Sequence, residues 1–234
     1  MRTLTQVGLS HLAVGLLAVV AMACQGGGST ADDTARRITD DELAMMVLAL
    51  EDFGAEFANF EAGEENGFMT AERRAEDSID PENEAADLKR FGWEAGYEEM
   101  YFNPAAGESG SKLWFVASGV DLHETAEGAA GYFEDSRAEV EDDVGKTREG
   151  IILDAAETFD VDIADEAAGL HFHVIAEDDS GSQYWASGVI FRRGRLIASV
   201  SIFSFEEQRL EEALRELAGN LNERIGSVLT GDTP

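Results

Sequence analysis

Apolar residues at helical spacing mark both ends of the folded part of the chain. Leu43, Val47 and Leu50 recur every three or four positions and predict a helix that ends near Gly54. Leucine, isoleucine and valine follow the same spacing over residues 210–228, which predicts a long amphipathic helix at the C-terminus. Both segments come after a Ser or Thr with a Glu three residues later, Thr39-x-x-Glu42 and Ser204-x-x-Glu207. This spacing is typical of a capping box, so it predicts where each helix starts.

A third helix is predicted in the middle of the chain. Asp121 and Glu124 form its expected start, and small and apolar residues follow as far as Val144. Gly128 and Gly131 weaken this helix by about 1 kcal/mol each relative to alanine. We expect these glycines to allow a close approach to the sheet.

Alternation of apolar and polar residues predicts strands between the helices. The expected strands cover residues 93–101, 113–122, 170–176, 183–192 and 196–203. The first two read as a hairpin with a long loop, and Arg193-Gly194 makes a tight turn between the last two. On the first strand we expect Trp93, Tyr97 and Tyr101 to share a face. Residues 61–84 read as a long loop or loose helical excursion, and residues 154–169 as a mixed acidic segment.

This order of elements predicts an α+β fold. A twisted antiparallel sheet of about five strands would pack against three or so helices in a single domain over residues 39–230. The length is ordinary for one domain, and we find no internal repeat.

The first 23 residues have the order of a secretory leader. Arg2 supplies a positive charge, residues 12–20 are apolar or small, and Ala21-Met22-Ala23 precede Cys24. The apolar run is shorter than the about 20 residues that span a bilayer. The sequence therefore predicts a signal peptide over residues 1–23.

The cysteine after the small residues resembles the lipobox of bacterial lipoproteins. The resemblance implies that Cys24 becomes the first mature residue and carries a lipid (palmitate among its acyl chains), which ties the protein to the extracytoplasmic side of a bacterial membrane. Cys24 is the only cysteine, so no disulfide within the chain is possible. Residues 24–38 are rich in Gly, Ser, Thr and Asp and read as a flexible tether that reaches roughly 20 Å.

The charge of the chain argues against nucleic acid as a partner. The formal net charge is −31, and the acidic residues are spread along the sequence. Such a field repels the phosphate backbone and anionic lipid surfaces. We therefore expect a well-hydrated exterior, with the membrane reached through the N-terminal lipid.

The histidines are the first candidates for chemistry. His171 and His173 are two residues apart on a predicted strand, so they share a face, and His123 ends another strand. Three imidazoles could bind zinc and leave a position open for catalysis. Nothing in the sequence requires the two strands to be neighbours, and no H-E-x-x-H motif occurs. We expect the histidines to lie on the solvated face of the sheet, without a metal or other cofactor.

Other candidate sites are weaker. The acidic run that contains Asp160, Asp162, Asp165 and Glu166 could bind calcium, but it lacks the glycine of an EF-hand loop. No G-x-S-x-G motif is present. If a ligand binds between sheet and helices, the residues expected to line its cleft are aromatic: Trp114, Tyr184 and Trp185.

Parts of the chain resemble uncharacterised exported lipoproteins of high-GC bacteria. The matching segments are GWEAGY (92–97), FDVDIADEA (159–167), VIFRRGRLIASV (189–200) and LAGNLNERI (217–225). The layout is also similar to extracytoplasmic sensor domains of mycobacterial Ser/Thr kinases and to PsbP/Mog1-like lipoproteins. These resemblances imply helices on a twisted antiparallel sheet and a binding or sensing role. The chain lacks the cysteines and the kinase segment of the sensor proteins, so no site residue carries over.

Taken together, these features favour a lipid-anchored module without catalytic activity that binds or senses a small ligand in the cell envelope. Two alternatives stay open at this point. One is an envelope scaffold or assembly protein with a protein partner, and the other is a metal-dependent hydrolase.

Overall fold

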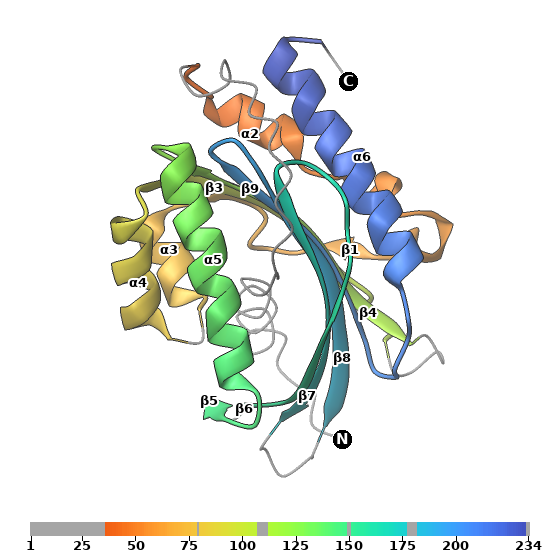
Figure 1. Cartoon of the computed structure of the whole chain (residues 1–234). Coiled ribbons are helices and arrows are strands. Elements are labelled where there is room, and N and C mark those ends of the chain that lie inside the picture. Colours follow the sequence, from red (N-terminus) through yellow and green to blue (C-terminus); the bar gives the residue numbers. More distant parts are fainter. Residues whose placement is uncertain (1–35, 79, 107–111, 149–150, 177–181, 233–234) are drawn as a thin grey trace.

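The computed structural model describes residues 36–78, 80–106, 112–148, 151–176 and 182–232. The predicted signal peptide, Cys24 and all but the last residues of the predicted tether lie outside these ranges. The described residues form an α+β fold in which one large antiparallel sheet carries helices on both faces (Figure 1). The predicted fold class is therefore confirmed.

The sheet has nine strands in the described part of the chain, more than the five predicted. They are β1 (Glu61–Ala62), β2 (Gly67–Met69), β3 (Trp93–Phe102), β4 (Leu113–His123), β5 (Thr147–Arg148), β6 (Ile151–Phe159), β7 (Glu166–Ala176), β8 (Gln183–Arg193) and β9 (Leu196–Ser204). Their order across the sheet is β1-β3-β4-β9-β8-β7-β6-β5, and β2 also pairs with β3. Strand β9 therefore lies at the centre, between β4 and β8.

The helices divide between the two faces. They are α2 (Asp40–Met46), α3 (Ala71–Glu76), α4 (Pro81–Arg90), α5 (Ala126–Asp143) and α6 (Glu211–Thr230), with 3-10 turns at Leu50–Asp52 and Ala55–Phe57. Figure 1 shows α2 and α6 on one side of the sheet and α3, α4 and α5 on the other. We call these sides the α6 face and the α5 face.

Each central strand contributes side chains to both faces, and this produces two hydrophobic cores. On β9, Val200 and Ile202 belong to the core under α6, which also buries Leu214 and Leu221 of that helix. Their neighbours Ile197 and Phe203 belong to the core under α5. The alternation follows from the two-residue repeat of a strand. Because both faces are covered, apolar residues occur on both faces of the central strands, with small and polar residues between them.

The five predicted strands are all present, but the segments around them hold structure that the sequence pattern missed. Residues 61–84 contain β1, β2, α3 and the start of α4, where Thr70 and Asp80 cap the helices. Strand β6 was also missed, because it mixes acidic and small residues. It lies near the edge of the sheet, where a strand has fewer neighbouring side chains to pack against and can therefore carry more polar residues.

Helix boundaries differ from the prediction at three places. The first helix ends at Met46, because Val47 is extended, and the 3-10 turns follow it. Ser204 does not cap the last helix; it ends β9, and its hydroxyl donates to the backbone oxygen of Glu206 at 2.7 Å. Asp121 lies within β4, and Thr125 caps α5 instead.

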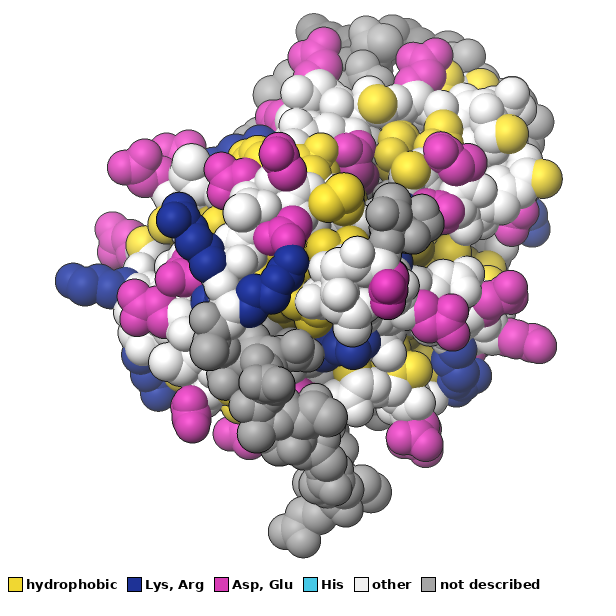
Figure 2. Space-filling view, turned by 90° about the horizontal axis from the view of Figure 1, so that it is seen from above, with side chains coloured by type: hydrophobic (Ala, Val, Ile, Leu, Met, Phe, Trp, Pro, Cys, Tyr) yellow, Lys and Arg dark blue, Asp and Glu magenta, His cyan; other side chains and the backbone are white. Residues whose placement is uncertain are grey.

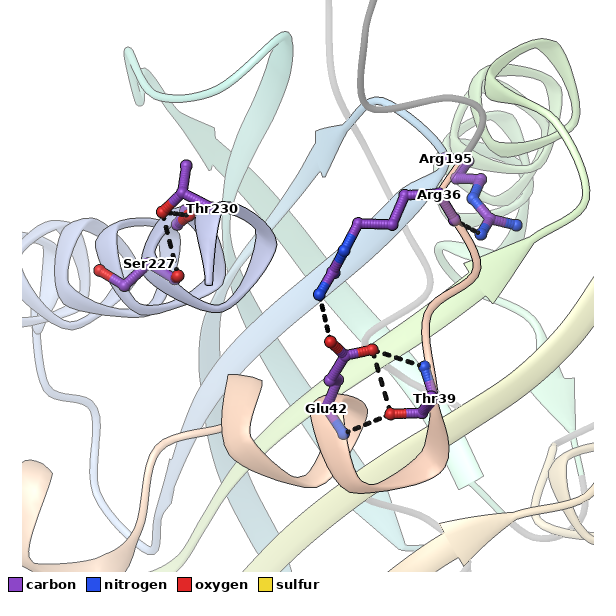
Figure 3. A network of polar contacts seen from close by, with 7 residues as sticks. Arg36, Thr39, Glu42, Arg195, Ser227 and Thr230 are labelled. Carbon is purple, nitrogen blue, oxygen red and sulfur yellow. Dashed lines mark hydrogen bonds and ion pairs between the residues drawn. The ribbon is translucent and has the colours of Figure 1, made fainter. Parts of the chain in front are cut away.

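The predicted capping box at the first helix is confirmed, and it adjoins the point where the described chain begins. The Thr39 side chain accepts from the Glu42 backbone, and the Glu42 carboxylate accepts from the Thr39 backbone at 2.8 Å (Figure 3). Arg36 forms an ion pair with the same carboxylate. Arg195, in the turn before β9, donates to the backbone oxygen of Arg36 at 2.6 Å. A hydrogen bond therefore joins the start of the described domain to the turn that leads into β9, the central strand of the sheet.

Among the charged side chains on the visible surface, the acidic ones are the most widespread. Figure 2 shows them scattered over one end of the molecule, with arginine or lysine between them and no single acidic patch. This agrees with the spread of charge along the sequence. Within the described ranges, no helix combines the length and apolar content that a membrane crossing requires.

The glycines of α5 do permit a close approach, but the neighbour is the end of α4 rather than the sheet. A Cβ added at Gly128 would lie 2.3 Å from the backbone oxygen of Phe91. One added at Gly131 would lie 2.6 Å from the Phe91 ring. Phe91 therefore packs directly on the backbone of α5.

We expect Gly128→Ala to lower the free energy of unfolding by about 1–3 kcal/mol, because the backbone of Phe91 must move. This loss would outweigh the gain of about 1 kcal/mol in helix propensity. Gly219→Ala on α6 is the matched control, since no atom lies within 4 Å of its added Cβ. The control should gain up to about 1 kcal/mol. Urea denaturation of the full chain measures both, and equal effects of the two substitutions would contradict the close packing.

Candidate functional site on the α5 face of the sheet

The three candidate histidines do not meet, because they lie on opposite faces of the sheet. His123 ends β4 on the α5 face, where its Nδ1 is 3.1 Å from the backbone oxygen of Phe91. Burial lowers its pKa, so the ring is neutral at pH 7. His171 and His173 share the α6 face of β7, as the spacing predicted. The expected solvated position is wrong, because both faces of the sheet are covered and both His123 and His171 are buried. In the described part of the chain, no group of three or more His, Cys, Asp or Glu residues could hold a metal ion.

The two histidines of β7 have different partners. His171 Nδ1 lies 2.6 Å from the hydroxyl of Ser187, directly across on β8, and burial lowers the pKa of His171. His173 stacks on Trp185 with ring centroids 4.6 Å apart, and its Nδ1 is 2.9 Å from the Asp154 carboxylate. A catalytic triad needs a carboxylate on the second nitrogen of the base. Among the described residues, Nε2 of His171 has no hydrogen-bond partner, so the Ser187–His171 pair is not such a triad.

The predicted aromatic lining is split by the alternation along β8. Trp114 and Tyr184 meet on the α5 face with ring centroids 6.2 Å apart, and both are buried. Trp185 points to the α6 face, where it stacks on His173. Trp114 also stacks on Phe205, which is 40% exposed. Two of the three predicted residues are therefore together, and the third is not.

The acidic run before β7 serves a structural purpose. Arg192 of β8 contacts Glu166 at 2.8 Å and Asp165 at 3.1 Å. The Asp165 carboxylate also accepts from the backbone of Gly194, at the turn with positive φ between β8 and β9. These carboxylates hold the hairpin turn, which was predicted correctly.

Two residues near the middle of the α5 face are partly exposed. Gly119 of β4 and Ser199 of β9 are cross-strand neighbours near the centre of the sheet, and both are partly exposed. A Cβ added at Gly119 would meet only sheet atoms, the Ser199 hydroxyl at 3.5 Å, Glu98 Cγ at 3.7 Å and the Tyr97 backbone oxygen at 3.8 Å. We call the partly exposed surface at Gly119 and Ser199, with Glu98 at its edge, the central hollow.

A buried polar network stands beside the central hollow. Arg74 of α3 lies 3.4 Å from Asp121 of β4 and 3.7 Å from Glu84 of α4. Trp93 Nε1 donates to Asp121 at 2.9 Å, and the hydroxyl of Tyr132 on α5 donates to Glu84 at 2.7 Å. The network joins five elements around one guanidinium.

Glu98 is the titratable group at the edge of the central hollow. Its side chain is buried, at 8% exposure, and burial raises its pKa to about 7. The positive charge of Arg74 opposes this rise, while Asp121 and Asp77 add to it. Burial also raises the pKa of Glu84. Near neutral pH, Glu98 can therefore exchange a proton, accept a hydrogen bond or hold a cation.

The sequence analysis missed Glu98 because it picked out the aromatic residues, and Tyr97 and Tyr101 lie on the other face of β3. A bulge between Trp93 and Ala95 turns Trp93 to the α5 face, so it does not share a face with Tyr97 as expected. The face that matters carries Gly96, Glu98, Met100 and Phe102. A charged residue on an otherwise apolar strand face is the signal that could have found it.

Two solved structures show similarity to this chain. The extracellular domain of PknH from Mycobacterium tuberculosis aligns with a TM-score of 0.50 at 11% identity, covering 84% of this chain and 98% of that domain. PA94 from Pseudomonas aeruginosa, a protein of unknown function, aligns with a TM-score of 0.30 at 13% identity over 56% of this chain and 83% of its own. No protein-family model and no curated sequence matches.

The likeness to the PknH domain shows the fold. It confirms the expected structural similarity to extracytoplasmic domains of mycobacterial kinases. The resemblance to exported lipoproteins and to PsbP/Mog1-like proteins stays a prediction.

The raised pKa of Glu98 has a consequence for stability. Between pH 4.5 and about 7, Glu98 is ionised in the unfolded chain but keeps its proton in the folded one. Folding stability from this group is therefore full below pH 4.5 and is lost as the pH rises toward 7. Glu98→Gln removes this loss. From pH 4.5 to pH 8, the free energy of unfolding of the variant should therefore rise by about 2–3 kcal/mol relative to that of the native chain.

Urea denaturation of the full chain at several pH values measures this difference. Glu216→Gln, an exposed position on α6, is the control and should show no such trend. A difference between the Glu98→Gln and native chains that stays constant from pH 4.5 to 8 would contradict the burial of Glu98.

Proposed function

We propose that the protein is a lipid-anchored module of the bacterial cell envelope that binds a small ligand in the central hollow and acts in sensing rather than catalysis. The observation that carries the proposal is the partial exposure of Gly119 and Ser199 in the middle of a sheet face that three helices cover. Helix-covered sheet faces are normally closed by packed side chains. A solvent-accessible place with convergent polar groups is where a ligand is expected.

The fold supports an extracytoplasmic role. The chain matches nearly the whole of the PknH domain, which is described as extracellular. The predicted leader and lipobox point to the same location, because a lipid on Cys24 would hold the chain on the extracytoplasmic side of a membrane. The short tether that follows would hold the described domain close to the bilayer surface.

The aromatic pair Trp114–Tyr184 supports the same side of the sheet as the ligand side. Both side chains lie on the α5 face, as the central hollow does. Trp185 and the β7 histidines lie on the α6 face and have partners of their own.

The anchor has a direct test. Cys24→Ala should move the protein from the membrane fraction to the soluble extracytoplasmic or secreted fraction, because no lipid can be attached. Labelling of growing cells with an alkyne analogue of palmitate, followed by fractionation, measures both attachment and location. Cys24→Ala protein that stays in the membrane fraction at the native level would refute the lipid anchor.

The ligand site is tested by filling it. Gly119→Val adds volume where the first atom fits without a clash, so the variant should fold and lose ligand binding. Compounds that raise the melting temperature of the native full chain should not raise that of Gly119→Val. Compounds that stabilise both chains equally would place binding elsewhere.

A further inference from the structure

We propose that the central hollow binds a small organic cation with N–H donors, and that the carboxylate of Glu98 receives it. The inference rests on the proposed function, since it names the ligand class of the same site. It follows from hydrogen-bond acceptors that lack donors, from the charges around them and from the available space.

Three buried acceptors on the α5 face have no donor among the described residues. One is His123 Nε2, and the two that bear on the central hollow are Glu98 Oε2 and the hydroxyl of Ser201, at 1% exposure. Ser201 lies two residues from Ser199 on β9, so both hydroxyls are on the same face. Native structures rarely leave buried polar atoms unpaired. A ligand that donates hydrogen bonds would satisfy such atoms.

The Glu98 side chain lies beside the partly exposed position at Gly119. Its Cγ lies 3.7 Å from the position of a Cβ on Gly119, while the Ser199 hydroxyl lies 3.5 Å away from that position. Solvent touches both Gly119 and Ser199. A group that enters over Gly119 would therefore meet the Glu98 side chain at once.

The surrounding charges leave room for one more cation. The charged groups that act on Glu98 are Arg73, Arg74 and Asp77 of α3 and Asp121 of β4. Glu84 of α4 and Tyr132 of α5 lie one step further away, as partners of Arg74 and of each other. Arg73 pairs with Asp77 at 3.6 Å, and Arg74 is shared between Glu84 and Asp121. Both guanidinium groups are thus engaged with other carboxylates, and a monovalent cation would balance Glu98.

An organic cation fits these groups better than a metal ion. The described residues offer no group of three or more side chains suited to metal ligation. Glu98 and Ser201 each present an acceptor oxygen, and an ammonium or guanidinium group offers directed N–H donors to such oxygens. The Arg74 charge close by would repel a divalent ion more strongly than a monovalent one.

Binding should be linked to the loss of a proton. Since the pKa of Glu98 is about 7, most copies carry a neutral Glu98 at pH 6 and an ionised one at pH 8. A cation prefers the ionised form, so its affinity should rise about tenfold from pH 6 to pH 8. At pH 6, binding should release nearly one proton.

The experiment uses the full chain, purified in a neutral maltoside detergent, with methylguanidinium as the probe at up to 100 mM. Isothermal titration at pH 6 in two buffers of different ionisation enthalpy measures affinity and proton release together. We expect saturable binding, proton release at pH 6 and an affinity about tenfold higher at pH 8. Tetramethylammonium carries the same charge without donors and should bind at least tenfold more weakly.

Glu98→Gln should abolish both the proton release and the pH dependence, while Glu216→Gln should bind as the native chain does. Because glutamine keeps the size of the side chain, a urea titration of Glu98→Gln shows whether the variant is folded. The pH dependence of the native chain is a second reading that needs no variant. Absence of saturable binding, binding that Glu98→Gln leaves unchanged, or equal binding of tetramethylammonium would each overturn the inference.

The same variants separate this inference from the proposed function. A neutral or anionic compound that binds the native chain and is blocked by Gly119→Val would keep the ligand-binding role and reject the cation. No binding of any compound that Gly119→Val blocks would reject both.

Discussion

The guanidinium of Arg74 is the interaction on which the α5 face depends. It lies between Glu84 of α4 and Asp121 of β4, while Tyr132 of α5 and Trp93 of β3 donate to the same two carboxylates. Removing one member of a buried ion pair leaves an uncompensated charge, which costs about 3–5 kcal/mol. The helices of this face are short or glycine-containing, so the network supplies order that their own packing lacks. It also explains why polar groups surround the central hollow.

Much of the fold could be predicted because the strands of a covered antiparallel sheet have a recognisable spacing of apolar residues. Alternation of apolar and polar residues predicted the five central strands, and Gly194 marked the hairpin turn that Asp165 holds. The pattern failed where local rules competed with distant contacts. Ser204 has the spacing of a helix cap, but the ladder with β4 and β8 keeps it in β9. Strand β6 was missed because a strand near the sheet edge needs fewer apolar residues.

The candidate site was harder to predict, because it depends on which residues a fold brings together. Tyr184 and Trp185 are adjacent in sequence, yet a strand sends them to opposite faces. Spacing alone placed His171 and His173 correctly on one face, but it could not place His123 on the other. Glu98 was missed because its surroundings are formed by Arg74 and Gly119, and neither residue is near it in sequence. A sequence shows which residues of one strand share a face, but it does not show which residues of other strands lie beside them.

The outer strands of the sheet bear on how copies of the protein behave when they are crowded together. Strands β1 and β5 are only two residues long, and β6 is broken by a bulge between Leu153 and Ala155. Short edge strands and bulges are features that limit edge-to-edge aggregation. The net charge of −31 adds mutual repulsion. Dense display of this domain on one surface should therefore leave each copy separate, with its own site open to the surrounding medium.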